Sequence, residues 1–323
     1  MSDNTPETII VGNKALPREA RASTCGKAII VGEHAVVYGA HAVAMPLKQL
    51  RMQIELKPAL KNHDESSEFH LKLGGKEVSK RISDVFPEAF ELLQQPTFSL
   101  NAKGHSNLPI GAGLGSSASL CIAIVKVLAD SMSLDISPAE LAYIGNKLEA
   151  RFHGNPSGLD TSIVAFEECV YFAKHKEIQA IPQKEECKQS WEFALIDSKV
   201  RASTLAMIRL AEPFFKGASG NRHLYEFDQL ASQVKDAIPS FHIDVVAEAM
   251  NRCHELLNLA GVVPHSLRQM IEDCRELGMP AAKITGAGGG GTIICLLDTE
   301  RAEEQTKRLQ MHFANHPVFR VSI

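Results

Sequence analysis

A glycine- and serine-rich segment that leads directly into an apolar helical run is the strongest constraint on how this chain folds. Residues 109–119 read Pro-Ile-Gly-Ala-Gly-Leu-Gly-Ser-Ser-Ala-Ser, and the apolar run continues to Asp130. Glycines let a backbone turn sharply and approach a ligand, and the first turn of a helix carries unpaired N–H groups and a partial positive charge. The segment therefore predicts a phosphate-binding loop. A flexible connection is the alternative, but a linker would not continue into a rigid apolar helix.

Length and composition narrow the class of protein. A chain of 323 residues with 45% hydrophobic and 22% charged residues is expected to form two globular domains. A net charge of −4 gives no basic surface for nucleic acid, and no apolar run approaches the ~20 residues that cross a bilayer. Residues 1–20 lack the apolar core of a signal peptide, so we expect a partly mobile leader and a cytoplasmic protein without nucleic-acid or membrane partners.

The seven cysteines are odd in number, scattered, and never spaced as Cys-x-x-Cys. We expect buried free thiols rather than disulfides or a zinc site.

Periodicity predicts a mixed fold of class α+β. The expected strands are 26–32, 52–56, 98–102, 168–173, 192–196, 292–297 and 319–323. The expected helices are 116–130, a second one opened by the capping box Ser137-Pro-Ala-Glu140 and ending at Gly154, several between 204 and 277, and 300–313. The predicted domains are residues 1–190 and 191–323.

Two common nucleotide motifs fail on inspection. Residues 25–28 (Cys-Gly-Lys-Ala) lack the upstream glycine and the Ser/Thr after the lysine that a P-loop needs. Residues 286–291 formally match G-x-G-x-x-G, but a strand-like segment follows where a dinucleotide site requires a helix. The dinucleotide interpretation is therefore rejected.

Four charged or titratable residues each have an ordinary explanation when taken singly. Glu149 fits a solvated glutamate near a helix end, and Asp160 fits a helix N-cap after a turn. Lys27 fits a surface lysine whose stem covers apolar atoms. His34 fits a hydrogen-bonded core histidine as well as a functional one. Only their occurrence together, in this order, favours a catalytic site.

Four segments in this order resemble the GHMP kinase superfamily. They are 25–39, 109–119, 153–160 and 283–292. Within the superfamily the chain is most similar to the mevalonate kinases, for which 153–160 is the most particular segment. The resemblance implies an N-terminal ATP-binding and catalytic domain like ribosomal protein S5 domain 2 (1–190) and a ferredoxin-like C-terminal domain (191–323), with the active site between them.

The same resemblance implies roles for individual residues. Asp160 is expected to take the proton from the 5-hydroxyl of mevalonate. Lys27 is expected to lower the pKa of that hydroxyl and to neutralise charge on the transferred phosphoryl group. Ser117 and Glu149 are expected to hold Mg²⁺ on the phosphates of ATP. The phosphates would be cradled by Pro109, Gly111, Ala112, Gly113, Leu114, Gly115, Ser116, Ser117 and Ala118.

The resemblance also assigns a substrate side, made of Glu33, His34, Thr204, Gly286, Ala287 and Gly288. Two positions depart from the family pattern. Cys25 stands where a proline is usual before Gly-Lys, and Arg201 stands where a proline is common, which shifts the family arginine by one position and leaves its role open.

The implied activity is transfer of the terminal phosphoryl group of MgATP to mevalonate, with ATP and mevalonate as partners and a homodimer as the family habit. Three alternatives stay open at this stage. One is another GHMP small-molecule kinase, such as a phosphomevalonate kinase or a galactokinase-like enzyme. The others are a non-catalytic ligand sensor with the GHMP fold and a simple nucleotide-binding structural module.

Overall fold

The structure is a computed structural model that describes residues 18–58, 69–153, 156–174, 176, 178–182 and 189–323. Nearly all of the predicted leader lies outside these residues. The strands are β1 (Ala20–Val31), β2 (Ala42–Pro58), β3 (Phe69–Leu73), β4 (Lys76–Glu77), β5 (Leu100–Ser106), β6 (Val170–Phe172), β7 (Gln179–Ala180), β8 (Glu192–Asp197), β9 (Ala281–Thr285), β10 (Thr292–Leu296) and β11 (Val318–Ser322).

The α-helices are α1 (Lys80–Ser83), α2 (Val85–Leu92), α3 (Ser116–Ser131), α4 (Pro138–His153), α5 (Leu159–Phe166), α6 (Thr204–Lys216), α7 (Gly220–Ala237), α8 (Ile243–Leu259), α9 (His265–Glu276) and α10 (Ala302–His312). Three short 3₁₀ turns accompany them: η1 (Ala35–Tyr38), η2 (Ile238–Ser240) and η3 (Thr299–Arg301). The mixed α+β class predicted from the sequence is confirmed.

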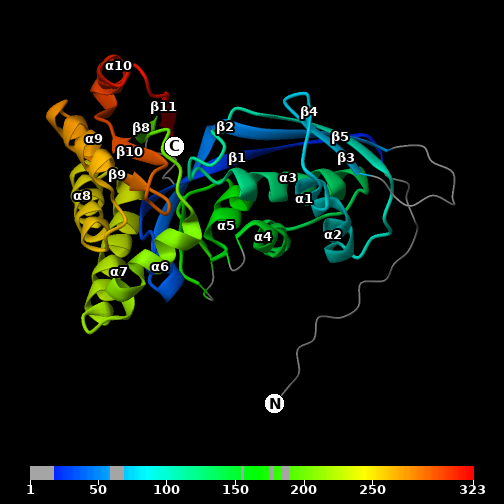
Figure 1. The fold of residues 1–323 in the computed structure, drawn as a ribbon, viewed down its shortest axis with the longest axis horizontal. Coiled ribbons are helices and arrows are strands. Elements are labelled where there is room, and N and C mark those ends of the chain that lie inside the picture. The colour runs from blue at the N-terminus through cyan, green and yellow to red at the C-terminus, as the bar shows by residue number, and fades with distance from the viewer. Residues whose placement is uncertain (1–17, 59–68, 154–155, 175, 177, 183–188) are drawn as a thin grey trace.

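A seven-stranded sheet forms the first half of the molecule. Its order is β4-β3-β5-β2-β6-β7, with β1 paired to β2. Helices α2, α3, α4 and α5 lie along one face of this sheet (Figure 1). Helix α3 is buried along almost its whole length, as its apolar composition predicts. The predicted capping box opens α4, because the Ser137 N–H donates to the Glu140 carboxylate at 2.9 Å.

Strand β2 is much longer than the predicted segment 52–56, and the reason is local. It pairs with β6 over residues 42–44 and with β5 over residues 52–58, while β1 runs along its other edge. Pro46 lies between these two stretches, where no second neighbour needs its missing N–H. Because of Pro46 and the polar residues after it, the first half of the strand shows no alternating pattern of apolar and polar residues, and it was not predicted.

Strand β1 begins at Ala20 rather than at Gly26, and β5 begins at Leu100 rather than at Phe98. From Cys25 onward every residue of β1 is buried, which gives the continuous apolar run that the sequence shows. Its first residues are partly exposed and more polar, so that they carry no comparable signal.

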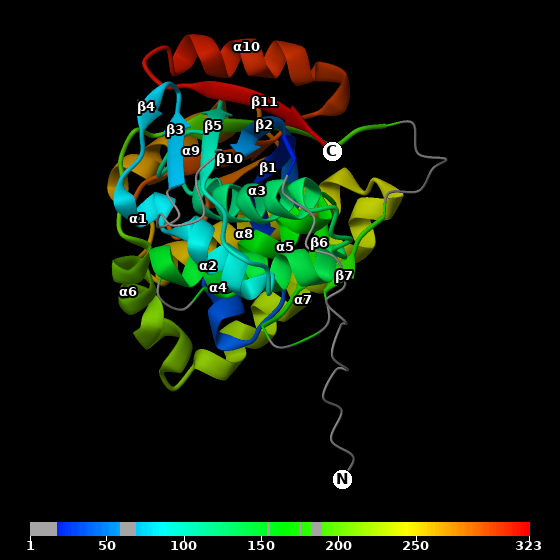
Figure 2. The same cartoon turned by 90° about the vertical axis from the view of Figure 1, so that its right-hand side faces the viewer.

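A four-stranded antiparallel sheet, in the order β11-β8-β10-β9, forms the second half. Helices α7, α8 and α9 stack beside it in Figure 1, and α10 lies over β11 in Figure 2. The predicted domain boundary at residue 190 falls between β7 and β8 and remains a prediction.

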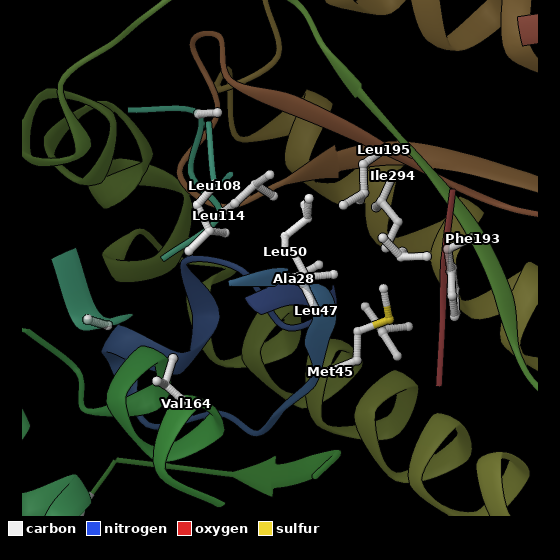
Figure 3. Packing of buried hydrophobic residues seen from close by; sticks show 14 of the residues in the cluster. Ala28, Met45, Leu47, Leu50, Leu108, Leu114, Val164, Phe193, Leu195 and Ile294 are labelled. Atoms are coloured by element: carbon white, nitrogen blue, oxygen red, sulfur yellow. The ribbon is translucent and has the colours of Figure 1, made fainter. Parts of the chain in front are cut away.

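One large apolar cluster joins the two sheets. Met45 and Leu47 of β2 lie toward Leu195 and Ile294 of the second sheet (Figure 3), and all four belong to the same buried cluster. Shared burial of this extent fixes the second sheet against β1 and β2. It therefore also fixes the loops that leave the two sheets at their junction.

Two further findings bear on the class of protein. The six cysteines among the described residues are free and buried, as predicted, while Cys187 lies outside the described residues. In the part of the chain that the structure describes, no helix has the length and apolarity needed to span a bilayer.

Candidate active site

The glycine loop between β5 and α3 is anchored by its apolar side chains and open along its glycines. Ala112 and Leu114 are buried, whereas Gly111 and Gly113 are exposed. Figure 3 shows Leu114 beside Leu108, within the apolar cluster. Helix α3 follows directly, so the exposed backbone of the loop and the first turn of the helix lie together. This is the arrangement that the sequence predicts for a phosphate seat.

Lys27 lies directly under this loop. Its backbone N–H donates to the Leu114 carbonyl at 3.0 Å. A Cβ placed on Gly115 would be 2.8 Å from the Lys27 Cγ, and Gly115 has a φ of +77°. Only glycine combines that backbone conformation with that contact. The loop therefore holds the stem of the lysine in place.

The amine of Lys27 forms an ion pair with Asp160. The Nζ to Oδ2 distance is 3.1 Å, and the two side chains are 4% and 31% exposed. The helix N-cap is Gly158, with a φ of +90°, so Asp160 lies within the first turn of α5 rather than at its cap. Both ordinary explanations, the surface lysine and the N-cap aspartate, are therefore wrong.

Ser117 and Glu149 form a second polar pair in the same place. The Ser117 hydroxyl donates to the Glu149 Oε1 at 3.1 Å, across from α3 to α4. Glu149 is only 2% exposed, so the solvated-glutamate explanation is also wrong. Burial, and then the charge of Asp160, raise the pKa of the Glu149 carboxyl to about 8. A carboxylate in this position is unfavourable unless a cation accompanies it.

The third glycine-rich segment packs against the first. The Thr292 hydroxyl donates to the Ala112 carbonyl at 2.9 Å. Added Cβ atoms on Gly291 and Gly286 would lie 3.0 Å from the Ala112 oxygen and 3.4 Å from the Gly113 oxygen. Strand β10, and not a helix, follows the glycines, which agrees with the rejection of the dinucleotide interpretation. Segments 109–115 and 286–292 thus pack directly against each other.

His34 links the first motif to this third segment. One ring nitrogen, Nε2, lies 2.8 Å from the Ala287 carbonyl oxygen, so the imidazole donates a proton there. Burial lowers the pKa of His34, which favours the neutral ring. Its other nitrogen, Nδ1, is buried and has no hydrogen-bond partner among the described residues. His34 therefore lies beside Ala287. The family resemblance assigns both residues to the substrate side.

Glu33 and His34 are both buried, but their side chains contact different residues. The Glu33 side chain is completely buried and forms an ion pair with Lys283 of β9. The expectation that its carboxylate lines the substrate side is not met, because the carboxylate has no exposed surface. Lys283 is the first residue of the third motif, and the resemblance assigns it no role. Its position inside an otherwise apolar strand was the signal that could have indicated a buried ion pair.

Thr204 and Arg201 lie where the chain passes from β8 into α6. Thr204 is the exposed first residue of α6, and no hydrogen bond among the described residues joins it to Asp160. Arg201 donates twice to the Asp197 carboxylate, at 2.7 and 2.8 Å. A Cβ on Gly111 would lie 3.5 Å from the Arg201 Cδ, so this arginine borders the phosphate loop.

Comparison with solved structures supports the fold. Mevalonate kinase from Methanococcus jannaschii matches with a TM-score of 0.78 and 24% identity, covering 93% of this chain and 96% of that one. L. major mevalonate kinase in complex with R-mevalonate matches with a TM-score of 0.80 and 18% identity, covering 95% and 98%. Lactococcus lactis galactokinase matches with a TM-score of 0.74 and 15% identity, covering 94% and 92%. At these identities the likeness shows the fold alone.

Sequence relatives cover almost the whole chain. Mevalonate kinase of Thermococcus sibiricus is 27% identical over 314 residues, which is 88% of this chain and 91% of the relative. Mevalonate kinase of Pyrococcus abyssi is 28% identical over 321 residues, which is 90% and 92%.

Two family models also match. The GHMP kinases N terminal domain matches residues 80–168, and the GHMP kinases C terminal domain matches residues 234–315. Together these segments make up more than half of the sequence, in the order that the family requires. The chain therefore belongs to the GHMP kinases.

Proposed function

We propose that this GHMP kinase transfers the terminal phosphoryl group of ATP to the 5-hydroxyl of mevalonate. The observation that carries the proposal is the meeting of Lys27 and Asp160, 3.1 Å apart, beneath the glycine loop. Phosphoryl transfer mainly requires positioning, charge neutralisation and a group that accepts a proton, and these residues offer all three. The curated relatives support the choice of acceptor, because those cited above are mevalonate kinases matched over most of their length.

In this mechanism the backbone of residues 111–116, which is exposed at Gly111 and Gly113, binds the phosphates at the N-terminus of α3. The amine of Lys27 neutralises negative charge that develops on the transferred group. Asp160 accepts the proton as the hydroxyl oxygen bonds to phosphorus and the bond from that phosphorus to the bridging oxygen of ADP breaks. A positioned base of this kind contributes on the order of 10²–10⁴ in rate.

The residues present also fit a magnesium ion bound with the nucleotide. Ser117 and Glu149 supply a hydroxyl and a carboxylate, the oxygen ligands that Mg²⁺ takes in nucleotide sites alongside phosphates and water. The raised pKa of Glu149 marks a place where a cation would stabilise the charged carboxylate. When bound, Mg²⁺ would supply charge neutralisation on the phosphate oxygens.

A coupled assay of ADP release tests the proposal with three acceptors: mevalonate, 5-phosphomevalonate and galactose. We expect turnover with mevalonate and background rates with the other two. Robust turnover of galactose or of 5-phosphomevalonate without turnover of mevalonate would reassign the acceptor. A wild type that binds ATP and mevalonate but releases no ADP with any of the three acceptors would favour the non-catalytic alternative, and an Asp160→Ala variant that turns mevalonate over like the wild type would remove Asp160 from the mechanism.

We also propose a reducing compartment, the cytoplasm, as the place of action, because the six described cysteines are free. A homodimer remains part of the proposal from the family resemblance. Size-exclusion chromatography with light scattering distinguishes it from a monomer.

A further inference from the structure

A completely buried ion pair joins the first motif to the third one. The Lys283 ammonium on β9 donates to the Glu33 Oε1, and it also donates to the carbonyl of Ile284 at 2.7 Å. Neither side chain has exposed surface. Removing two charges from water is costly, so such a pair gives little stability by itself, and a role in fixing geometry is the better reason for its presence.

The second oxygen of the Glu33 carboxylate is also occupied. The thiol of Cys253 on α8 donates to Glu33 Oε2, with a sulfur-to-oxygen distance of 3.4 Å. Glu33 is thereby held by partners from β9 and from α8. Since it directly follows β1 and Gly32, the carboxylate fastens the turn after β1 to the second half of the molecule.

The fastened turn has an unusual backbone. Gly32 has a φ of +103°, and a Cβ there would lie 2.5 Å from Ala42. His34 has a φ of +59° with a ψ of −49°, and a positive φ is uncommon outside glycine. Such conformations persist only where the surrounding contacts enforce them. The buried pair is one such contact, and the hydrogen bond from His34 to the Ala287 carbonyl is another.

We propose that Glu33 and Lys283 are positioning residues for the acceptor side of the site. The pair sets the turn that places His34 against Ala287, and it thereby sets where residues 286–291 lie relative to the phosphate loop. This inference deepens the proposed function and rests on it for the identity of the acceptor. Neither residue touches the substrate, because both side chains are enclosed.

The test uses the double variant Glu33→Gln with Lys283→Met. Either single substitution leaves a buried polar or charged partner without its counterpart, so we expect both single variants to lose stability. The double variant removes both charges and should fold. The matched control is Glu192→Gln with Arg320→Met, which removes an ion pair of 2.8 Å between β8 and β11 whose carboxylate is also buried.

We expect the folded double variant to show a kcat about tenfold or more below the wild type and a raised KM for mevalonate. Its Kd for ATP should stay within about threefold. The control pair should leave both kinetic constants unchanged. A second readout is the imidazole NMR resonance of His34, assigned with a His34→Gln variant, which should shift in the double variant and not in the control.

The outcomes separate the two proposals. A folded double variant with kinetic constants within about twofold of the wild type and an unmoved His34 resonance would overturn the positioning role. A wild type that releases no ADP with mevalonate would overturn the proposed function alone, because the His34 resonance still reports on the pair.

Discussion

Lys27 and Asp160 meet at 3.1 Å with very different exposure, 4% for the lysine side chain and 31% for the aspartate. Lys27 belongs to the buried part of β1, whereas Asp160 lies in the first turn of α5 and is partly exposed. A ligand seated on the glycine loop would therefore meet a buried, ion-paired cation and a more accessible carboxylate. This asymmetry suits a site in which the lysine orders the phosphate and the aspartate meets the acceptor.

The contact between Gly115 and Lys27 gives a first prediction. In a Gly115→Ala variant, the new methyl group would lie 2.8 Å from the Lys27 Cγ, so the stem must move and the amine with it. We expect kcat to fall about tenfold or more. The control is Gly278→Ala, since Gly278 has a similar φ of +86° but open space around the added Cβ. The measurement is kcat of both variants in steady-state kinetics, and an equal fall in kcat in the two variants would contradict the prediction.

The proposed metal ligands give a second prediction. Ser117→Ala removes one oxygen ligand and Glu149→Gln replaces a charged ligand with a neutral amide, so the Mg²⁺ concentration for half-maximal activity should rise by about tenfold or more in each variant. Glu140→Gln, an exposed change on the same helix α4 as Glu149, is the control. Titration of activity with Mg²⁺ at saturating ATP measures the effect. An unchanged midpoint in both site variants would remove these residues from the metal site.

His254 gives a prediction for stability against pH. Burial, and then the charges of Arg275 and Lys283, lower the pKa of His254 from 6.5 to about 4. Between pH 6.5 and pH 4, His254 therefore binds a proton in the unfolded chain but stays neutral in the folded chain. The free energy of unfolding falls as the pH drops through this range. At pH 4.5 this group alone should cost about 2–3 kcal/mol.

The comparison is between the wild type and His254→Gln, each unfolded with urea at pH 7 and at pH 4.5. Because other groups titrate in both proteins, only the difference between them reports on His254. The variant should lose less stability on acidification. Equal losses would show that His254 is protonated normally in the folded protein.

The capping box at α4 gives a prediction for stability without an effect on activity. The Glu140 backbone N–H donates to the Ser137 hydroxyl at 3.3 Å, and the Glu140 carboxylate accepts from the Ser137 N–H. Ser137→Ala should cost about 1 kcal/mol of unfolding free energy. Urea unfolding measures it, and kcat should stay at the wild-type value. A lowered kcat would mean that the start of α4 influences Glu149 at its other end.

The sequence predicted the parts of the fold that carry a strong local signal. Helix α3 is apolar on nearly every face and α4 starts with a capping box, and both begin where they were predicted to begin. Strand β2 was largely missed, because its pairing partners change along its length and Pro46 occupies the stretch between them. Such a strand is defined by distant partners, which local periodicity does not reveal.

The site shows the same division. Singly, Lys27, Glu149 and Asp160 favoured ordinary structural explanations, and the order of the motifs indicated that they belong together. The structure brings all three to one place: burial and the charge of Asp160 raise the pKa of the Glu149 carboxyl, and the charge of Lys27 is among the effects that lower it. Glu33 was misassigned for a physical reason. A glutamate beside His34 gives no sequence signal that its carboxylate turns inward to a lysine on a strand of the other sheet.

A mutant cycle on Lys27 and Asp160 tests the account most directly. The variants are Lys27→Met, Asp160→Asn and the double, measured for kcat with mevalonate and for the Kd of ATP. We predict that each single change lowers kcat by about 10²–10⁴ and that the double loses little more, since residues acting as one unit are not additive. ATP binding should change by only a few fold. An Asp160→Asn variant with kcat within about twofold of the wild type would contradict the account.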